Sequence, residues 1–221
     1  MQPVLIVLVI IAFAAVAYFF HRLEQQRREA LLLWATRKGF DFDPARRKGL
    51  KDRWAGLKIL RRGHSQSGKN FITGRWEGRD VTMFDFQFVT GSGKNRQTHR
   101  RGLVILAIDH PTIPLQIRRE NPFDKVGEFL GMDDIDFESA EFSRKFHVKS
   151  SDRKWAYDVI HTRTMDYLLR ERFQELEFGF AELCVIKNGR HDAESYEESL
   201  RFAKGLLDLI PDYVVQQMKG P

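Results

Sequence analysis

Residues 73–89 have the sequence TGRWEGRDVTMFDFQFV, and this segment decides the fold class. Glu77 and Gly78 are turn residues between two runs rich in aromatic and β-branched side chains, which is typical of a β-hairpin. In the second run every other residue from Phe84 to Phe88 is Phe, so these rings share one face of a strand and Asp85 lies on the opposite face. We expect the Phe face to be core and Asp85 to point outward.

Further runs of the same kind lie on both sides of this hairpin, and Gly, Asn and Ser separate them. Strands are expected at 57–61, 70–76, 80–89, 101–109 and 114–119, and at 173–180 and 182–187 near the C-terminus. A longer loop, residues 89–95, joins the hairpin to the next strand. Because short loops favour the pairing of consecutive strands, the sequence predicts an antiparallel β meander.

Helical patterns occur before and after the strands. Residues 22–38 carry an apolar stripe at helical spacing and end at Gly39, a residue type common just after helix C-termini. Further helices are expected at 45–54, 123–130, 153–160 and 164–170, and an amphipathic one at 192–210 before Pro211. Together with the strands, these helices predict an α+β fold: a meander with packed helices and a C-terminal amphipathic helix.

Residues 4–20 contain no charge, no Gly and no Pro, and nearly every side chain is aliphatic or aromatic. With a helical rise of about 1.5 Å per residue the run is roughly 26 Å long, close to the roughly 30 Å hydrocarbon core of a bilayer. A cleaved signal peptide is the alternative, but no Lys or Arg precedes the run and it continues through aromatic residues 18–20. We therefore predict an uncleaved span that contacts the lipid bilayer through residues 4–20.

Basic residues follow this span and none precedes it. Arg22, Arg27 and Arg28 lie directly after it, so the positive-inside rule places the N-terminus outside and the large C-terminal part in the cytoplasm of a bacterial inner membrane. The predicted parts are a transmembrane anchor (1–21), a juxtamembrane helical stalk (22–39) and a single α+β cytosolic domain (40–217). A chain that starts near Leu33 is expected to fold, because no core element is expected before it.

Charge is distributed unevenly along the chain. Residues 22–101 carry 20 Lys and Arg against 8 Asp and Glu, whereas residues 102–221 carry 16 against 22. A basic membrane-proximal half attracts anionic lipid headgroups, and the candidate contacts are Arg46, Arg47, Lys48, Lys51, Arg61, Arg62, Lys94 and Arg96. Nucleic acid is less favoured, because no helix-turn-helix, RNP-type aromatic pair or zinc finger is found. The alternative is that these basic residues only set the membrane topology.

The motifs that carry known chemistries do not match. The loop that contains Gly91, Gly93 and Lys94 lacks the spacing and the following helix of a phosphate-binding P-loop. The acidic segment 131–138 has the wrong residues for an EF-hand, and the histidines have no metal-ligand spacing. The lone Cys184 lies in a strand-like run, where a small buried hydrophobe is expected. We predict no catalytic residue, no metal site and no cofactor.

A resemblance rests on four segments, which are residues 73–88, 131–139, 142–148 and 155–169. Together they look like a group of uncharacterised bacterial proteins that pair one N-terminal membrane helix with a cytosolic α+β domain of unknown function. The resemblance implies a bacterial origin and this architecture, and it carries over no catalytic residue.

The leading interpretation is a non-enzymatic, membrane-tethered cytoplasmic domain that binds a protein partner or the lipid surface. One alternative is an enzyme that acts on a lipid or a phosphorylated substrate at the inner membrane surface. Another is a subunit of a larger membrane assembly, in which the anchor itself contacts a membrane protein.

Overall fold

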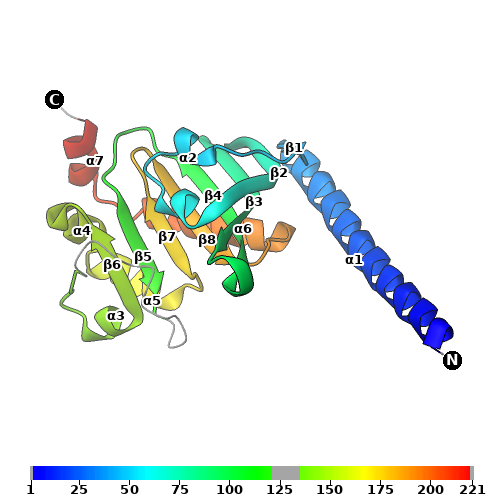
Figure 1. Ribbon diagram of the computed structural model, residues 1–221. Coiled ribbons are helices and arrows are strands. Elements are labelled where there is room, and N and C mark those ends of the chain that lie inside the picture. The colour runs from blue at the N-terminus through cyan, green and yellow to red at the C-terminus, as the bar shows by residue number, and fades with distance from the viewer. Residues whose placement is uncertain (1, 121–134, 220–221) are drawn as a thin grey trace.

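Helix α1 (Gln2–Lys38) runs without a break from the apolar N-terminal segment into the body of the protein (Figure 1). The computed structural model describes residues 2–120 and 135–219. Gly39, with a φ of 72°, ends the helix in the left-handed conformation that glycine adopts without strain. α1 is long and apolar enough to cross a membrane, by its length and composition.

Within the described residues, eight strands form one antiparallel sheet in the order β1-β2-β3-β4-β8-β7-β5-β6. The strands are β1 (Asp41–Asp43), β2 (His64–Trp76), β3 (Arg79–Thr90), β4 (Gln97–Ala107), β5 (Leu115–Arg119), β6 (Phe146–Ser150), β7 (Glu175–Phe178) and β8 (Glu182–Asn188). The first four follow chain order, as expected for a meander. With the helices packed around this sheet, the predicted α+β class is confirmed.

The hairpin at the centre of the sequence forms as predicted. Trp76 of β2 pairs with Arg79 of β3, and the two residues between them have positive φ angles, 47° at Glu77 and 82° at Gly78. Positive φ at both central positions gives the turn a twist that matches the strands. The longer loop between β3 and β4 contains the short 3-10 helix η2 (Gly93–Asn95).

Helices cover both faces of the sheet unequally. One face packs against α1 and against most of the remaining helices, and its core includes Leu31, Trp155 and Tyr196. These helices are α3 (Ala140–Lys145), α4 (Arg153–Val159), α5 (Thr162–Arg170), α6 (Ala193–Leu207) and α7 (Asp212–Lys219). The other face packs against α2 (Leu50–Arg53) and the 3-10 helix η1 (Lys58–Arg61).

The Phe side chains of β3 lie on the second face, buried against the segment that contains α2 and η1. The expectation that Asp85 points outward is wrong, because α1 and α6 cover the opposite face as well. Met83, two residues earlier on that face, is fully buried, and Asp85 itself is only 5% exposed. Strict alternation in a strand therefore separates two buried environments here, not core from solvent.

Local capping defines two of the later helices. The carboxylate of Asp152 accepts a hydrogen bond from the Trp155 amide at the start of α4, and Asp192 accepts one from the Ser195 amide at the start of α6. Both are N-cap contacts that satisfy amides left free by the first helical turn. α6 ends at Leu207, and α7 begins directly after Pro211.

Several expected elements differ from the structure. The strand expected at 57–61 is replaced by η1 over Lys58–Arg61, and the helix expected at 45–54 is confined to Leu50–Arg53. Strands β1 and β6 were not expected. The helix expected at 123–130 lies outside the described residues, as does the N-terminal half of the acidic segment 131–138.

The expectation that nothing before Leu33 belongs to the core is also wrong. Leu31 is 1% exposed and packs in the larger core cluster, together with Ala35. The physical reason is that the helical stripe of residues 22–38 faces the sheet, since α1 contacts both β1 and α6.

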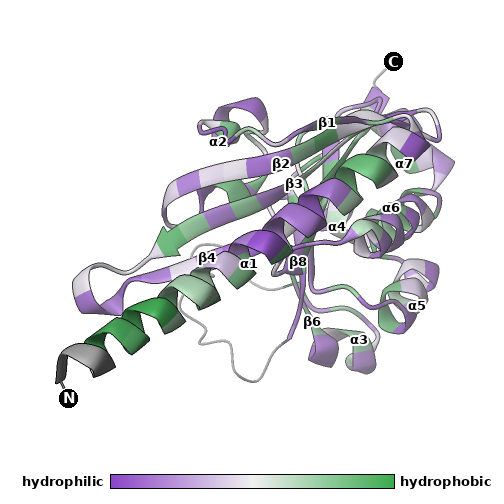
Figure 2. Ribbon diagram, turned by 90° about the vertical axis from the view of Figure 1, so that its right-hand side faces the viewer, coloured by the Kyte–Doolittle hydropathy of each residue, from purple (hydrophilic) through white to green (hydrophobic). Residues whose placement is uncertain are grey.

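Figure 2 shows how polarity changes along α1. The N-terminal part is hydrophobic, and a hydrophilic stretch separates it from the end that packs on the domain. The hairpin formed by β3 and β4 extends in the same general direction as the apolar end of α1 (Figure 2). The tip of this hairpin, with Lys94 and Arg96, therefore lies on the side of the domain that faces the apolar segment.

Candidate functional site

A buried ion pair fastens α1 to the sheet. The Arg27 guanidinium donates two hydrogen bonds to the Asp85 carboxylate, from Nη1 to Oδ2 at 2.8 Å and from Nη2 to Oδ1 at 2.7 Å. The side chains are 18% and 6% exposed. A paired fork of this kind has both higher strength and stricter geometry than a single contact.

Neighbouring polar groups complete the environment of this pair. Arg27 Nε donates to the backbone carbonyl of His191 at 2.9 Å, and Asn70 Nδ2 donates to Asp85 Oδ2 at 2.7 Å. Burial acts to lower the pKa of Arg27, but the hydrogen bonds to Asp85 outweigh it and the pKa is raised. Arg27 therefore attaches α1 to β3 and to the loop before α6, and Asn70 of β2 supports the same carboxylate.

His191 is the most enclosed histidine of the described residues, with no exposed surface. Its ring stacks on Tyr196 at 4.5 Å between centroids, and its Nε2 lies 3.0 Å from the Ser199 hydroxyl. Burial, with smaller contributions from Lys187 and Arg27, lowers the pKa of His191 to about 3. A Cβ at Gly102 would lie 1.9 Å from the His191 ring, so only glycine fits on β4 under this histidine. His191 is a neutral packing residue.

A small basic pocket lies beside the Arg27–Asp85 ion pair, where β2, β3 and β4 continue past α1. Its volume is about 220 Å³, and Asp85 forms part of its wall. Its lining residues are Arg46, Ser67, Lys69, Asp85, Phe86, Gln87, Arg100 and Arg190. Four of these eight residues are basic, and the one carboxylate among them is bound to Arg27. The pocket is therefore an electropositive site.

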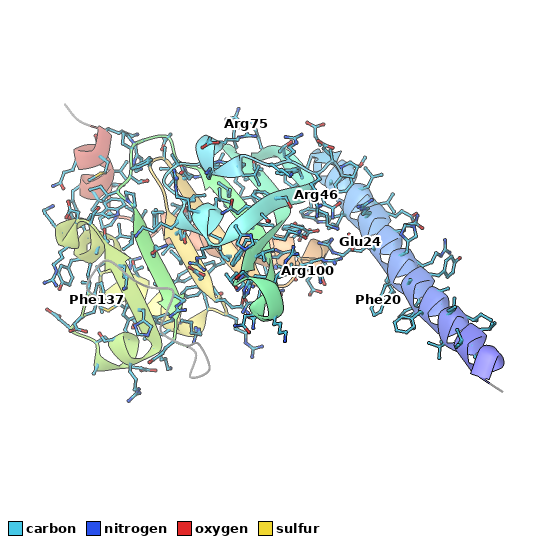
Figure 3. All side chains as sticks on the ribbon, in the orientation of Figure 1. Phe20, Glu24, Arg46, Arg75, Arg100 and Phe137 are labelled. Atoms are coloured by element: carbon cyan, nitrogen blue, oxygen red, sulfur yellow. The ribbon has the colours of Figure 1, made fainter. Side chains whose placement is uncertain are left out.

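Glu24 of α1 is bound by two of these cations. Its Oε1 accepts a hydrogen bond from Lys69 Nζ at 2.5 Å, and its Oε2 accepts one from Arg190 Nη1. Burial would raise the pKa of Glu24, but Lys69 and Arg190 outweigh it and the pKa is lowered. Figure 3 shows Glu24, Arg46 and Arg100 at the end of the domain from which α1 emerges.

The structure brings together only a few of the eight basic residues predicted to contact lipid. Arg46 lines the pocket, and Lys94 and Arg96 lie exposed at the tip of the β3–β4 hairpin. Arg47 pairs with Asp43 and lies over the Phe71 ring.

The remaining predicted contacts lie elsewhere on the domain. Lys48, Lys51 and Arg61 are exposed on the segment that contains α2 and η1. Arg62 does not face the pocket, because its side chain pairs with Glu175 and Glu177.

Arg62 belongs to a second buried charge cluster, on the face of the sheet opposite to Asp85. Its guanidinium binds both oxygens of Glu175, with Nη1 to Oε2 at 2.9 Å, and lies 3.4 Å from Glu177 Oε1. Glu177 Oε2 accepts the Ile59 amide at 3.0 Å, and Oε1 accepts the side-chain amide of Gln116 at 2.7 Å. Burial and the negative charge of Glu175 raise the pKa of Glu177 to about 7.

A larger cleft of about 1030 Å³ lies between α5, β8 and α6. Its walls mix basic residues, such as Arg119 and Lys187, with acidic Glu171 and Glu198 and with the aromatic rings of Phe173 and Phe202. None of the predicted lipid contacts lines this cleft.

The described residues contain no cluster of three or more His, Cys, Asp or Glu that could hold a metal ion. Cys184 is fully buried on β8, which confirms the expectation of a small buried hydrophobe. Burial raises the pKa of its thiol, so the reactive thiolate form is disfavoured.

Sequence reasoning did not connect the residues that meet at this pocket. Lys69 and Glu24 are 45 residues apart in the chain, and Arg190 is 166 residues from Glu24. No local spacing links them. The available signal was Asp85, a carboxylate between Phe84 and Phe86, because such a residue requires a cationic partner when it is buried.

Comparison with known proteins is informative about the fold. No protein-family model matches the sequence, and no curated protein matches it. One solved structure is similar, the crystal structure of the mycobacterial trehalose monomycolate transport factor A, TtfA. The TM-score is 0.58 at 15% sequence identity, and the match covers 84% of this chain and 96% of that chain. At this identity the likeness concerns the fold alone.

Proposed function

We propose that this protein is a non-enzymatic accessory protein that holds a binding domain in a fixed orientation at the inner face of a bacterial membrane. α1 anchors it with the N-terminus outside, and the domain acts as a subunit of a membrane assembly. The three predicted parts remain part of this proposal, with residues 22–39 acting as a stalk that is packed on the domain.

The observation that carries the proposal is that the single helix α1 contains both the apolar segment and the part that packs on the domain. Residues such as Ile6, Phe13 and Phe20 are 60%, 73% and 64% exposed, so the domain leaves the apolar half of α1 uncovered. Contiguous apolar surface of this extent favours a membrane or a partner. The other half of the same helix is fixed by Leu31, Ala35 and the Arg27–Asp85 pair. A flexible tether would need none of these contacts.

Two further points support the proposal. The structural neighbour is named as a transport factor, which suits an accessory role in a process at a membrane. Arg46, Lys94 and Arg96 are exposed basic residues, which suits contact with anionic headgroups if the apolar segment spans the bilayer.

An enzyme that acts on a lipid or a phosphorylated substrate is the second candidate, and the basic pocket favours it. However, the lining of the pocket includes no histidine or cysteine. Its carboxylate, Asp85, already accepts hydrogen bonds from Arg27 and Asn70. Binding without chemistry is therefore the better account of this pocket.

The orientation can be tested with a reporter fused after Pro221. A reporter that is active only in the cytoplasm should be active, and the protein should stay in the membrane after a carbonate wash. Activity of a periplasmic reporter in the same position would overturn the assignment and the partner argument with it.

The fixed orientation requires a second experiment. A Gly-Ser linker inserted between His21 and Arg22 leaves the anchor and the packed half of α1 intact but uncouples them. We expect photo-crosslinks from the domain to a membrane-protein partner in the native chain and their loss in the linker variant. The same linker inserted at the Glu77–Gly78 turn is the matched control and should keep the crosslinks. Identical crosslinks in all three proteins would contradict the proposal.

A further inference from the structure

The basic pocket has more positive charge than the fold itself uses. Lys69 and Arg190 bind Glu24, whereas the side chains of Arg46 and Arg100 have no ion-pair partner among the described residues. The carboxylate of Asp85 is already balanced by Arg27. Within the described part of the chain, two arginines are therefore left without an anion at the edge of a pocket that also contains the two partners of Glu24.

The polar groups of the pocket are aligned by the sheet. Gln87 of β3 lies between Ser67 of β2 and Arg100 of β4 in the pairing register, so these side chains form one row across three strands. Lys69 and Asp85 form the next pair along the β2–β3 ladder. A hydroxyl, a carboxamide and two arginine forks provide donors for the oxygens of a phosphate group.

The size of the pocket limits what it can hold. Its volume of about 220 Å³ is below the roughly 300–1,000 Å³ that is typical of sites for drug-sized ligands. A compact, multiply charged group therefore fits better than a large apolar molecule.

Helix α1 fixes the distance, measured along its axis, between the end of the apolar segment and the pocket. Glu24 follows Phe20 by four residues, one helical turn or about 6 Å. The headgroup layer of a bilayer is roughly 5–8 Å thick on each side of the hydrocarbon core. The side chains that bind Glu24 therefore lie at the depth of lipid phosphates when residues 4–20 span the membrane.

We propose that this pocket binds the phosphate group of an anionic membrane lipid, and that Glu24 occupies part of the site as an internal anion until the phosphate replaces it. The choice of a lipid as the source rests on the proposed function, whereas the phosphate chemistry rests on the pocket alone. Replacement frees Glu24 from Lys69 and Arg190, so binding also changes how the first turn of α1 after the apolar segment is held.

Soluble probes separate the pocket from the membrane. The full chain in an uncharged detergent can be titrated by calorimetry with dihexanoyl phosphatidic acid, with inorganic phosphate and with dihexanoyl phosphatidylcholine. We expect phosphatidic acid to bind, phosphatidylcholine to bind much more weakly, and affinity to fall as salt rises above about 0.15 M.

Three variants test the residues. Arg46→Gln/Arg100→Gln should weaken phosphatidic acid binding by about 10-fold or more, because two charged donors are removed from exposed positions that make no ion pair with any residue the structure describes. Lys48→Gln/Arg61→Gln removes the same charge outside the pocket and should leave the affinity unchanged. Glu24→Gln should tighten binding, because the competing carboxylate is removed.

Each outcome has one meaning for the proposal. Absence of binding, or equal weakening by the two double variants, would overturn the pocket and leave the proposed tethering function untouched. Tighter binding of inorganic phosphate than of phosphatidic acid would overturn the lipid as the source. Unchanged or weaker binding by Glu24→Gln would overturn the exchange. Failure of the carbonate wash instead counts against the proposed function, because the titration needs no membrane.

Discussion

Two buried arginine–carboxylate clusters attach segments outside the sheet to its strands, and they differ in the ratio of cations to carboxylates. Arg27 meets one carboxylate, Asp85, on the face covered by α1. Arg62 meets two, Glu175 and Glu177, on the face covered by η1. Both clusters fasten a segment outside the sheet to one of its strands, yet only the second has an excess carboxylate.

The difference determines which contact responds to pH. Arg62 binds both oxygens of Glu175 and lies 3.4 Å from Glu177 Oε1, so one guanidinium serves two carboxylates. Lys58 is the other nearby cation on this segment, and burial lowers its pKa in spite of the charge of Glu177. The Arg27–Asp85 pair has one cation for one carboxylate. In the Arg62 cluster, the second carboxylate, Glu177, gains and loses a proton near neutral pH.

The largest expected effect comes from breaking the balanced pair. Arg27→Met leaves the buried Asp85 carboxylate without its cation and should lower the free energy of unfolding by about 3–5 kcal/mol. Arg22→Met, at an exposed position on the same helix, is the matched control and should change it little. Thermal unfolding of the full chain in mild detergent measures both. The double variant Arg27→Met/Asp85→Leu should recover much of the loss, and failure to recover would show that the charge itself is required.

The second-largest expected effect tests apolar packing, as distinct from charge, where α1 contacts the domain. Leu31→Ala removes a side chain that is 1% exposed and should cost about 2–5 kcal/mol through lost burial and a cavity. Leu32→Ala and Leu33→Ala truncate neighbours that are 47% and 58% exposed and should cost much less. Equal effects at the three positions would mean that α1 does not pack as the structure shows.

The unbalanced cluster should give stability a pH dependence. The pKa of Glu177 is raised to about 7 in the fold from its ordinary value of 4.5, so the folded chain holds a proton that the unfolded chain has lost between these values. Stability should therefore fall as pH rises from about 4.5 to 7, by at most about 1.4 kcal/mol per unit, and then level off.

Glu177→Gln should remove this pH dependence and unfold at a higher temperature than the native chain above pH 7. The two proteins should converge near pH 4.5, where Glu177 is protonated in the fold. Glu175 faces Arg62, and Lys149 lies on β6, with β5 between it and β7, so Arg62→Met is the informative second variant. It should increase the pH dependence, because the guanidinium that binds Glu175 and contacts Glu177 is lost. An unchanged pH profile in Glu177→Gln would assign the proton to another group.

Local rules predicted the parts of this fold that depend on neighbouring residues. The Glu77–Gly78 turn and the Gly39 helix end each follow from a few consecutive residues, and both are confirmed. The resemblance to uncharacterised bacterial proteins stays a prediction, whereas the α+β architecture that it implied is confirmed. The strand predicted at 57–61 was wrong, because the apolar side chains of this segment suit a 3-10 turn over the sheet as well as a strand.

Long-range pairing could not be predicted in the same way. β4 pairs with β8, some 80 residues later, and this pairing brings Arg190 beside Glu24. Alternation in β3 identified two faces but could not say that α1 and α6 cover the face of Asp85. The basic pocket therefore depends on contacts between segments for which sequence spacing gives no signal.

The smallest expected effect tests whether burial is what distinguishes these ion pairs. Lys38, at the C-terminal end of α1, lies 3.0 Å from Glu197 of α6, but their side chains are 45% and 33% exposed. Lys38→Ala should cost less than about 1 kcal/mol, because water and salt screen the pair and only the helix-end charge is lost. Trp34→Phe also removes a contact of Glu197, the 2.7 Å hydrogen bond from Trp34 Nε1, in a half-buried setting, and should cost more. If Lys38→Ala destabilised the chain as much as Arg27→Met, the strength of the joint would come from the number of ion pairs along α1, and the contrast between buried and exposed pairs would fail.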